Sequence, residues 1–145
     1  MFALALLIVL GTALAESEGD SVTGSGKVAA DLVAGIAEGT AILSVEGEKF
    51  EGTVTVIVPP PTNGAFIGVV HEFKFGESTL ATIGDEIMKP ADDPGMFVLN
   101  GNMNITDGTG DFLGASGQMS VHGKLKFTSD TTADVSFNVN GVISR

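Results

Sequence analysis

The sequence predicts a single all-β domain of about eight antiparallel strands, arranged as a sandwich or a closed barrel. Apolar residues recur at every second position from Gly39 onward. Glycine accounts for 20 of the 145 residues, about twice its usual share, which favours tight turns. Alternate residues of a strand point to opposite faces, so we expect one face of the sheet to be buried and the other to face water.

The alternating stretches follow one another along the chain with short interruptions. In order, they are residues 40–45, 49–58, 65–75, 79–88, 97–105, 118–127 and 134–140. The residues expected to face inward in the regular stretches are Ala41, Leu43, Val45, Phe50, Val54, Val56, Val58, Phe97, Leu99, Met103, Ile105, Met119, Val121, Leu125, Phe127, Val135, Phe137 and Val139. Residues 65–75 are apolar on both faces until Glu72.

Turn-forming segments separate these stretches. Residues 59–64 read PPPTNG, where proline cannot donate to a strand ladder and Asn-Gly suits a turn. Residues 76–78, 107–110 and 129–131 also predict turns, and residues 89–95 form the longest clear loop. Short loops of this kind join sequential antiparallel strands.

The N-terminal residues 1–15 read MFALALLIVLGTALA, which predicts a cleavable signal peptide. Their apolar run is too short for a membrane span of ~20 residues, and Ala13 and Ala15 fit a small-residue cleavage site. The alternatives are a membrane anchor or a buried helix. We expect a secreted or periplasmic protein, a flexible lead-in over residues 16–38 and a barrel domain over residues 39–145. Within the lead-in, residues 28–36 could form two helical turns or a poor first strand.

Composition excludes several classes of function. Acidic residues outnumber basic ones 18 to 7, for a net charge of −11, and the basic residues form no cluster along the sequence. Such a chain repels nucleic acids and, once the signal is cleaved, anionic membrane surfaces. No cysteine is present, so disulfides and thiolate metal sites are excluded.

No metal site or cofactor is expected. Asp107 and Asp111 flank a glycine-rich turn, as acidic residues do in calcium loops. The sixth and twelfth positions of that loop would need Gly and Glu, and here they are Phe112 and Gln118.

One motif stands out within residues 105–117, which read ITDGTGDFLGASG. It resembles the GTGxFxGAxG signature of the allene oxide cyclase and dirigent barrels, and of the bacterial exported branch of that superfamily. The segments 71–75 with 79–82, and 137–143, also resemble the bacterial group, so the resemblance covers about residues 39–143. It implies an eight-stranded antiparallel barrel that assembles as dimers or trimers. No catalytic residue of the plant enzymes can be matched here.

The motif is expected to serve structure rather than catalysis. Gly108 and Gly110 permit a positive φ in a tight turn, and Phe112 is expected to plug the core. Gly114 and Gly117 allow the sharp bending that a small barrel needs.

His71 and Asp85 are the candidate acid and base. His71 shares strand parity with Ile67, Val69 and Phe73, whereas Asp85 shares it with Ile83 and Ile87. If both pointed inward from neighbouring strands, they could face each other. The alternative is a hydrogen-bonded polar pair that plugs one barrel end.

The leading functional hypothesis is a non-enzymatic barrel that binds a small apolar ligand or acts as a structural or interaction module. The candidate ligand-binding residues are Val56, Ile67, Phe73, Met119 and Phe137. The alternative is an isomerase or cyclase acting on an apolar substrate inside the barrel.

Self-association is also expected, because charges are sparse on the outward face of the strands. The uncharged outward residues are Thr53, Thr55, Asn100, Asn102, Asn104, Ser136, Asn138 and Asn140.

Overall fold

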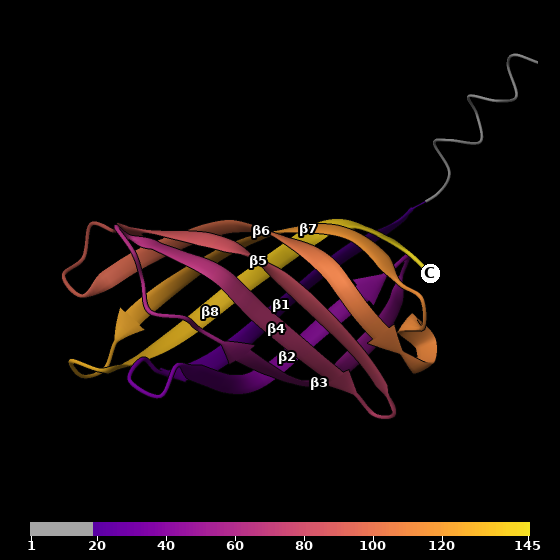
Figure 1. The fold of residues 1–145 in the computed structure, drawn as a ribbon, viewed down its shortest axis with the longest axis horizontal. Helices are drawn as coiled ribbons and strands as arrows, with labels where there is room; N and C mark the ends of the chain where they lie inside the picture. Colours follow the sequence, from indigo (N-terminus) through magenta and orange to yellow (C-terminus); the bar gives the residue numbers. More distant parts are fainter. Residues whose placement is uncertain (1–18) are drawn as a thin grey trace, which may run out of the picture.

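The computed structural model describes residues 19–145 and shows a closed barrel of eight antiparallel strands (Figure 1). The strands are β1 (Asp20–Asp31), β2 (Ile36–Val45), β3 (Glu48–Ile57), β4 (Ala65–Phe75), β5 (Ser78–Pro90), β6 (Met96–Thr109), β7 (Ser116–Phe127) and β8 (Thr132–Ser144), with one 3₁₀ turn, η1 (Gly110–Phe112). Each strand pairs with its neighbours in sequence, and β1 pairs with β8 to close the ring. The prediction of an all-β, eight-stranded antiparallel barrel is confirmed. The proposed signal peptide, residues 1–15, lies outside the described residues.

The structure corrects the predicted start of the barrel. Strand β1 falls inside residues 16–38, which the sequence assigned to a flexible lead-in, so the barrel begins at Asp20 rather than at Gly39. Of residues 28–36, the first four complete β1, the next four form a turn and the last opens β2. The strand is hard to see in the sequence because small residues occupy much of its inner face. A Cβ on Gly26 would lie 2.4 Å from the Phe137 ring, which fills the space instead.

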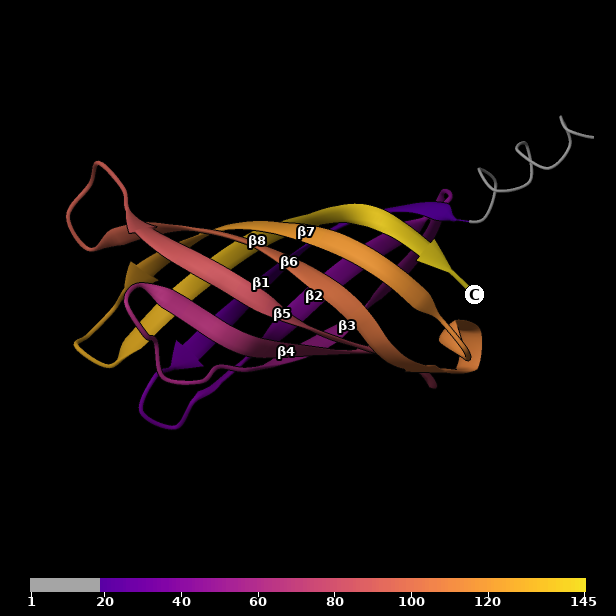
Figure 2. The same ribbon diagram turned by 45° about the horizontal axis from the view of Figure 1, so that its top comes forward.

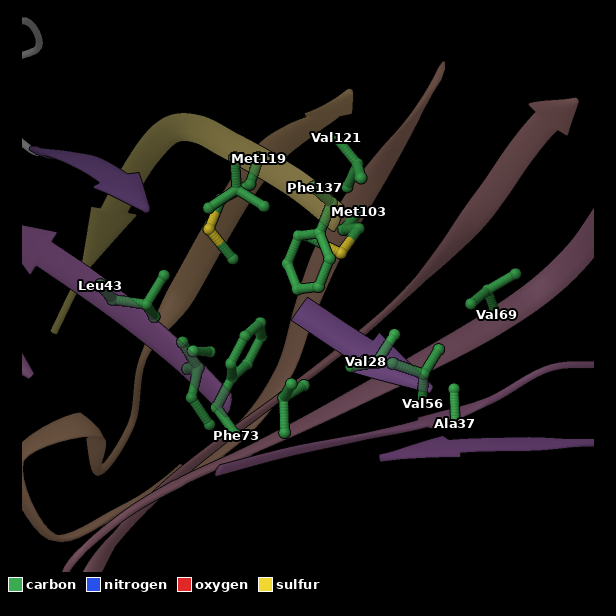
Figure 3. Close-up of a cluster of buried hydrophobic side chains, with 14 of the residues drawn as sticks. Val28, Ala37, Leu43, Val56, Val69, Phe73, Met103, Met119, Val121 and Phe137 are labelled. Atoms are coloured by element: carbon green, nitrogen blue, oxygen red, sulfur yellow. The ribbon is translucent and has the colours of Figure 1, made fainter. Parts of the chain in front are cut away.

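The inward residues form one continuous core. The alternation predicted for β2, β3, β6, β7 and β8 agrees with the burial seen along these strands, with Leu43, Val54, Met103 and Val121 fully buried. Figure 3 shows side chains from both sides of the barrel converging on its middle, where the rings of Phe73 and Phe137 project. Burial of this apolar surface is the main stabilising term for a fold without disulfides.

The two ends of the barrel differ. One end carries the C-terminus and η1, and the other carries the β1–β2, β3–β4, β5–β6 and β7–β8 loops (Figures 1 and 2). At the first end Phe112 packs against Phe50 and Phe75, with ring centroids 4.9 and 6.0 Å away. The Arg145 guanidinium lies 5.8 and 5.7 Å from the centroids of Phe50 and Phe112. This aromatic plug closes the end.

The glycine motif builds the aromatic plug. Gly110 (φ +62°), Gly114 (φ +76°) and Gly117 (φ +137°) all have the positive φ that favours glycine. Gly108 is required for a different reason than the sequence suggested: its φ is not positive, but a Cβ there would lie 2.1 Å from the carbonyl oxygen of Phe112. These conformations turn the chain back so that Phe112 enters the core.

Gly110→Val is expected to lower the free energy of unfolding by about 1–3 kcal/mol. A β-branched side chain is strained at this φ, and a Cβ would lie 2.5 Å from Ser78 Oγ, which accepts a hydrogen bond from the Asp111 amide. Gly114→Val is the matched control, because a Cβ at Gly114 meets nothing within 4 Å. The melting temperature of Gly110→Val should be lower than that of Gly114→Val. Equal melting temperatures would contradict the packing argument.

Candidate functional site

A cavity lies at the end of the barrel opposite the aromatic plug. Residues from all eight strands line it, its volume is about 40 Å³, and we call it the open-end cavity. Its apolar lining includes Ala30, Ala37, Val56, Val69, Val121 and Phe137, and its polar lining consists of His71 and Glu86. A single water needs roughly 10–15 Å³ on the same measure, so the cavity has room for a few waters or a short hydrocarbon group. It is much smaller than the pockets that enclose a whole drug-sized ligand, at roughly 300–1,000 Å³.

His71 of β4 and Glu86 of β5 form the polar part of this lining. Both are almost fully buried, with 3% and 7% of their surfaces exposed. His71 Nε2 lies 3.7 Å from Glu86 Oε2. The imidazole stacks on the Phe73 ring with centroids 6.1 Å apart, and it forms a T-shaped pair with the Phe137 ring with centroids 5.6 Å apart.

A glycine makes room for the carboxyl group. Gly101 of β6 is the cross-strand neighbour of Glu86. A Cβ on Gly101 would lie 2.8 Å from Glu86 Cγ and 2.2 Å from the Asp85 carbonyl oxygen. Any larger residue would therefore force Glu86 or the backbone of β5 to shift.

Burial keeps both groups neutral over a wide pH range. Removal from water raises the pKa of Glu86 to about 7 and lowers the pKa of His71 to about 4. Between these values the pair is a neutral imidazole beside a protonated carboxyl group, rather than an ion pair. The 3.7 Å separation is also longer than a hydrogen bond.

Two atoms of this pair lack a hydrogen-bond partner within residues 19–145, namely His71 Nδ1 and Glu86 Oε2. Buried polar atoms are nearly always paired, because an unpaired one costs about 1–3 kcal/mol. A ligand hydroxyl or carbonyl group that reached the pair would find a donor and an acceptor at this point.

The structure contradicts the predicted pairing of His71 with Asp85. Asp85 is exposed on the outer wall, where its Oδ1 accepts a hydrogen bond of 2.9 Å from the Gly68 amide. Gly68 (φ +79°) lies in a β-bulge between Phe66 and Val69. The bulge reverses the parity of β4, so Ile67 points outward and is 57% exposed. Ile67 is therefore no ligand-binding residue of the interior.

The acidic partner that the sequence argument missed is Glu86. In β5 the inward positions are those of Leu80, Thr82 and Glu86, whereas Ile83 and Ile87 point outward and are exposed. The large apolar residues suggested the opposite orientation. The only available signal was the parity of Leu80 and Thr82, carried forward to Glu86.

The other candidate ligand-binding residues divide into two groups. Val56 and Phe137 line the open-end cavity. Phe73 and Met119 are almost fully buried in the core and are not part of the cavity lining.

No group of three or more His, Asp or Glu side chains within residues 19–145 is placed to hold a metal ion. Asp107 Oδ1 accepts from the Gly108 amide, and Asp111 Oδ2 accepts from Ser78 Oγ. None of the described helical segments is long and apolar enough to cross a bilayer.

Comparison with known proteins finds similarity to two solved dirigent structures. The pterocarpan synthase dirigent protein GePTS1 matches with a TM-score of 0.43 and 16% identity, over 90% of this chain and 88% of that chain. The pterocarpan synthase dirigent protein PsPTS1 matches with a TM-score of 0.46 and 13% identity, over 90% of this chain and 97% of that chain. Neither a protein-family model nor a curated protein matches the sequence. At these levels of identity the likeness concerns the barrel fold alone.

Proposed function

We propose that this protein is a non-enzymatic barrel that holds a small apolar group in the open-end cavity. The observation that carries the proposal is the combination of an apolar lining with the two unpartnered atoms of His71 and Glu86. Apolar pockets with a few convergent polar groups are the usual form of small-molecule sites. The apolar lining would provide affinity, and the pair would orient one polar atom of the ligand.

The cavity size limits what can bind. At about 40 Å³ it accepts a short alkyl chain or the end of a longer molecule, while the rest of the ligand would extend past the loops into solvent. A hydroxyl group at the buried end of such a chain could donate to an acceptor or accept from a donor on the pair. A short primary alcohol is therefore the simplest probe.

Titration with 1-butanol or 1-hexanol is expected to shift the methyl NMR signals of Val56, Val69 and Val121 in a saturable manner. Ala30→Leu should abolish saturation because the larger side chain fills the cavity, whereas the outward-facing neighbour Ala29→Leu should preserve it. The same spectra report whether each variant is folded. Shifts that rise linearly with alcohol, or that are equal in both variants, would overturn the binding proposal in favour of a structural or interaction module.

A second candidate function is an isomerase or cyclase acting on an apolar substrate. The specific observation in its favour is the state of the pair, since a carboxyl group with a pKa of about 7 can take or give a proton near neutral pH. Glu86→Gln separates the two functions. It should abolish turnover if Glu86 is a catalytic acid or base, and it should leave the binding of 1-hexanol in place if the barrel only holds a ligand.

Export and self-association belong to the same proposal. The apolar run and Ala13-x-Ala15 pattern of residues 1–15 and the glycine motif support an exported barrel of the allene oxide cyclase and dirigent type. N-terminal sequencing of secreted material should begin at Glu16.

For self-association, the best-suited surface is the outward apolar row Ile36–Ile57–Val70–Ile83, whose members are cross-strand neighbours on β2 to β5. Light scattering at several concentrations tests it.

A further inference from the structure

Three of the seven basic residues meet on the outer wall of the barrel, although the sequence shows no cluster. Lys27 of β1 is the cross-strand neighbour of Ser136 of β8, and Ser136 is in turn the neighbour of Lys124 of β7. Lys126 follows on the same face of β7. Adjacent strands lie about 4.8 Å apart, so the Lys27 and Lys124 backbones stand roughly 10 Å apart on either side of Ser136. Figure 1 shows the three strands side by side.

The three lysines form no ion pair in the part of the chain that the structure describes, where no carboxylate lies within 4.0 Å of the ammonium group of Lys27, Lys124 or Lys126. Asp134 of β8 is the cross-strand neighbour of Lys126, and Glu38 of β2 lies farther along the same row. Both carboxylates are on the side of Lys126 and the barrel's open end. Lys27 and Lys124 have no acidic cross-strand neighbour.

The surface around Ser136 is concave. Three shallow hollows, of about 340, 470 and 590 Å³, each have Ser136 in their lining. Lys27 and Lys124 each border two of them. We call these three adjacent hollows together the lysine trough. Its two smaller hollows have no carboxylate in their lining.

Uncharged polar side chains extend the trough away from Lys126. Asn100, His122, Asn138 and Ser25 form one row of outward cross-strand neighbours. The next row consists of Asn102, Ser120, Asn140 and Thr23. Amides and hydroxyls both donate and accept hydrogen bonds, as sugar hydroxyls do.

We propose that the lysine trough binds an acidic oligosaccharide. The flexible ammonium groups of Lys27 and Lys124 would converge on a sugar carboxylate above Ser136, and the amide and hydroxyl rows would hydrogen bond to the neighbouring ring hydroxyls. A sugar chain with one charge per unit or fewer suits three lysines in an acidic protein. A nucleic acid, with one charge per ~1.7 Å of duplex, would be repelled by the remaining carboxylates.

Calorimetric titration of the full chain with tetragalacturonate tests this proposal. In low salt we expect saturable binding, no binding of the fully methyl-esterified oligomer, and binding at least tenfold weaker for sodium acetate. The double variant Lys27→Gln/Lys124→Gln should weaken tetragalacturonate binding at least tenfold. The matched control Lys49→Gln/Lys74→Gln removes the same charge from β3 and β4 and should leave the affinity within twofold.

Three results would overturn the proposal. They are absence of tetragalacturonate binding, equal losses in the two double variants, and acetate binding as tightly as the oligomer, which would indicate a site for an ion only. All four substituted lysines are exposed, so the variants should fold, and circular dichroism checks this. The trough lies outside the open-end cavity, so a negative result with tetragalacturonate would leave the alcohol-binding test unaffected.

Discussion

Glu86→Gln is expected to stabilise the folded protein at neutral pH by about 3 kcal/mol, because each unit of pKa shift corresponds to ~1.4 kcal/mol. Burial raises the pKa of Glu86 from 4.5 to about 7. Between these values the folded state keeps the proton that the unfolded state releases, so the contribution of Glu86 to wild-type stability falls as pH rises from 4.5 to 7. Glutamine has nearly the shape of the protonated carboxyl group and cannot ionise, so the variant avoids this loss.

The decisive measurement is urea unfolding of wild type and Glu86→Gln at pH 4.5, 6 and 7.5. The free energies of unfolding of the two proteins should differ little at pH 4.5. The advantage of the variant over wild type should then increase steadily up to pH 7.5. Glu72→Gln, an exposed neighbour on β4, is the control and should show no such trend. A difference that is the same at all three pH values would mean that Glu86 is already ionised across this range.

His71 contributes a slope of the opposite sign in the same protein. Burial lowers its pKa from 6.5 to about 4, so the unfolded state binds a proton that the folded state refuses, and stability falls as pH drops from 6.5 to 4. Between pH 4.5 and 6.5 the two slopes nearly cancel. The free energy of unfolding of the wild type therefore changes little with pH in this range. A change with pH becomes visible only when one of the two residues is replaced, as in Glu86→Gln or a His71 variant.

Phe112→Ala is expected to lower the free energy of unfolding by about 3–5 kcal/mol, the usual range for truncating a buried phenylalanine. Phe112 is 0% exposed, it packs on Phe50 and Phe75, and the Arg145 guanidinium covers its ring. Its removal would leave a hole at the closed end that these rigid rings cannot fill. Denaturant unfolding measures the loss, with the exposed neighbour Leu113→Ala as control. A loss below about 1 kcal/mol would show that the aromatic plug is dispensable.

Much of the barrel could be predicted from the sequence because apolar and polar residues alternate in most of its strands. Val54 and Met103, for example, each lie between two polar residues, and a period of two places such residues on one face of a strand. Strand β1 was missed because its inward glycines make room for large residues of the two adjacent strands. Gly24 leaves space for Leu43 of β2 and Val139 of β8, and Gly26 leaves space for Phe137 of β8. The inner face of β1 therefore has little apolar signal of its own.

The site was half predictable. His71 is inward, as its parity with Val69 and Phe73 indicated. Its partner could not be found by assuming that the large apolar residues of β5 point inward. In this strand Ile83 and Ile87 point outward and Glu86 points inward. The bulge at Gly68, held by Asp85, likewise depends on a contact between two strands. The lysine trough could not be predicted from the sequence for the same reason. Its lysines become neighbours only when β1, β8 and β7 pair side by side.

Closure of the ring by β1 and β8 has a consequence for the order of folding. The register runs from Asp20 opposite Ile143 to Asp31 opposite Thr132, so the first strand of the barrel cannot complete its pairing until the last strand has been synthesised. Contacts this distant in sequence form slowly, and until they form, one edge of β1 is unpaired. An unpaired edge rich in large apolar residues would recruit other chains. On β1, serine, threonine and lysine face outward, and the inward face combines only two valines with glycine and alanine. This composition makes the unpaired strand a poor template for aggregation.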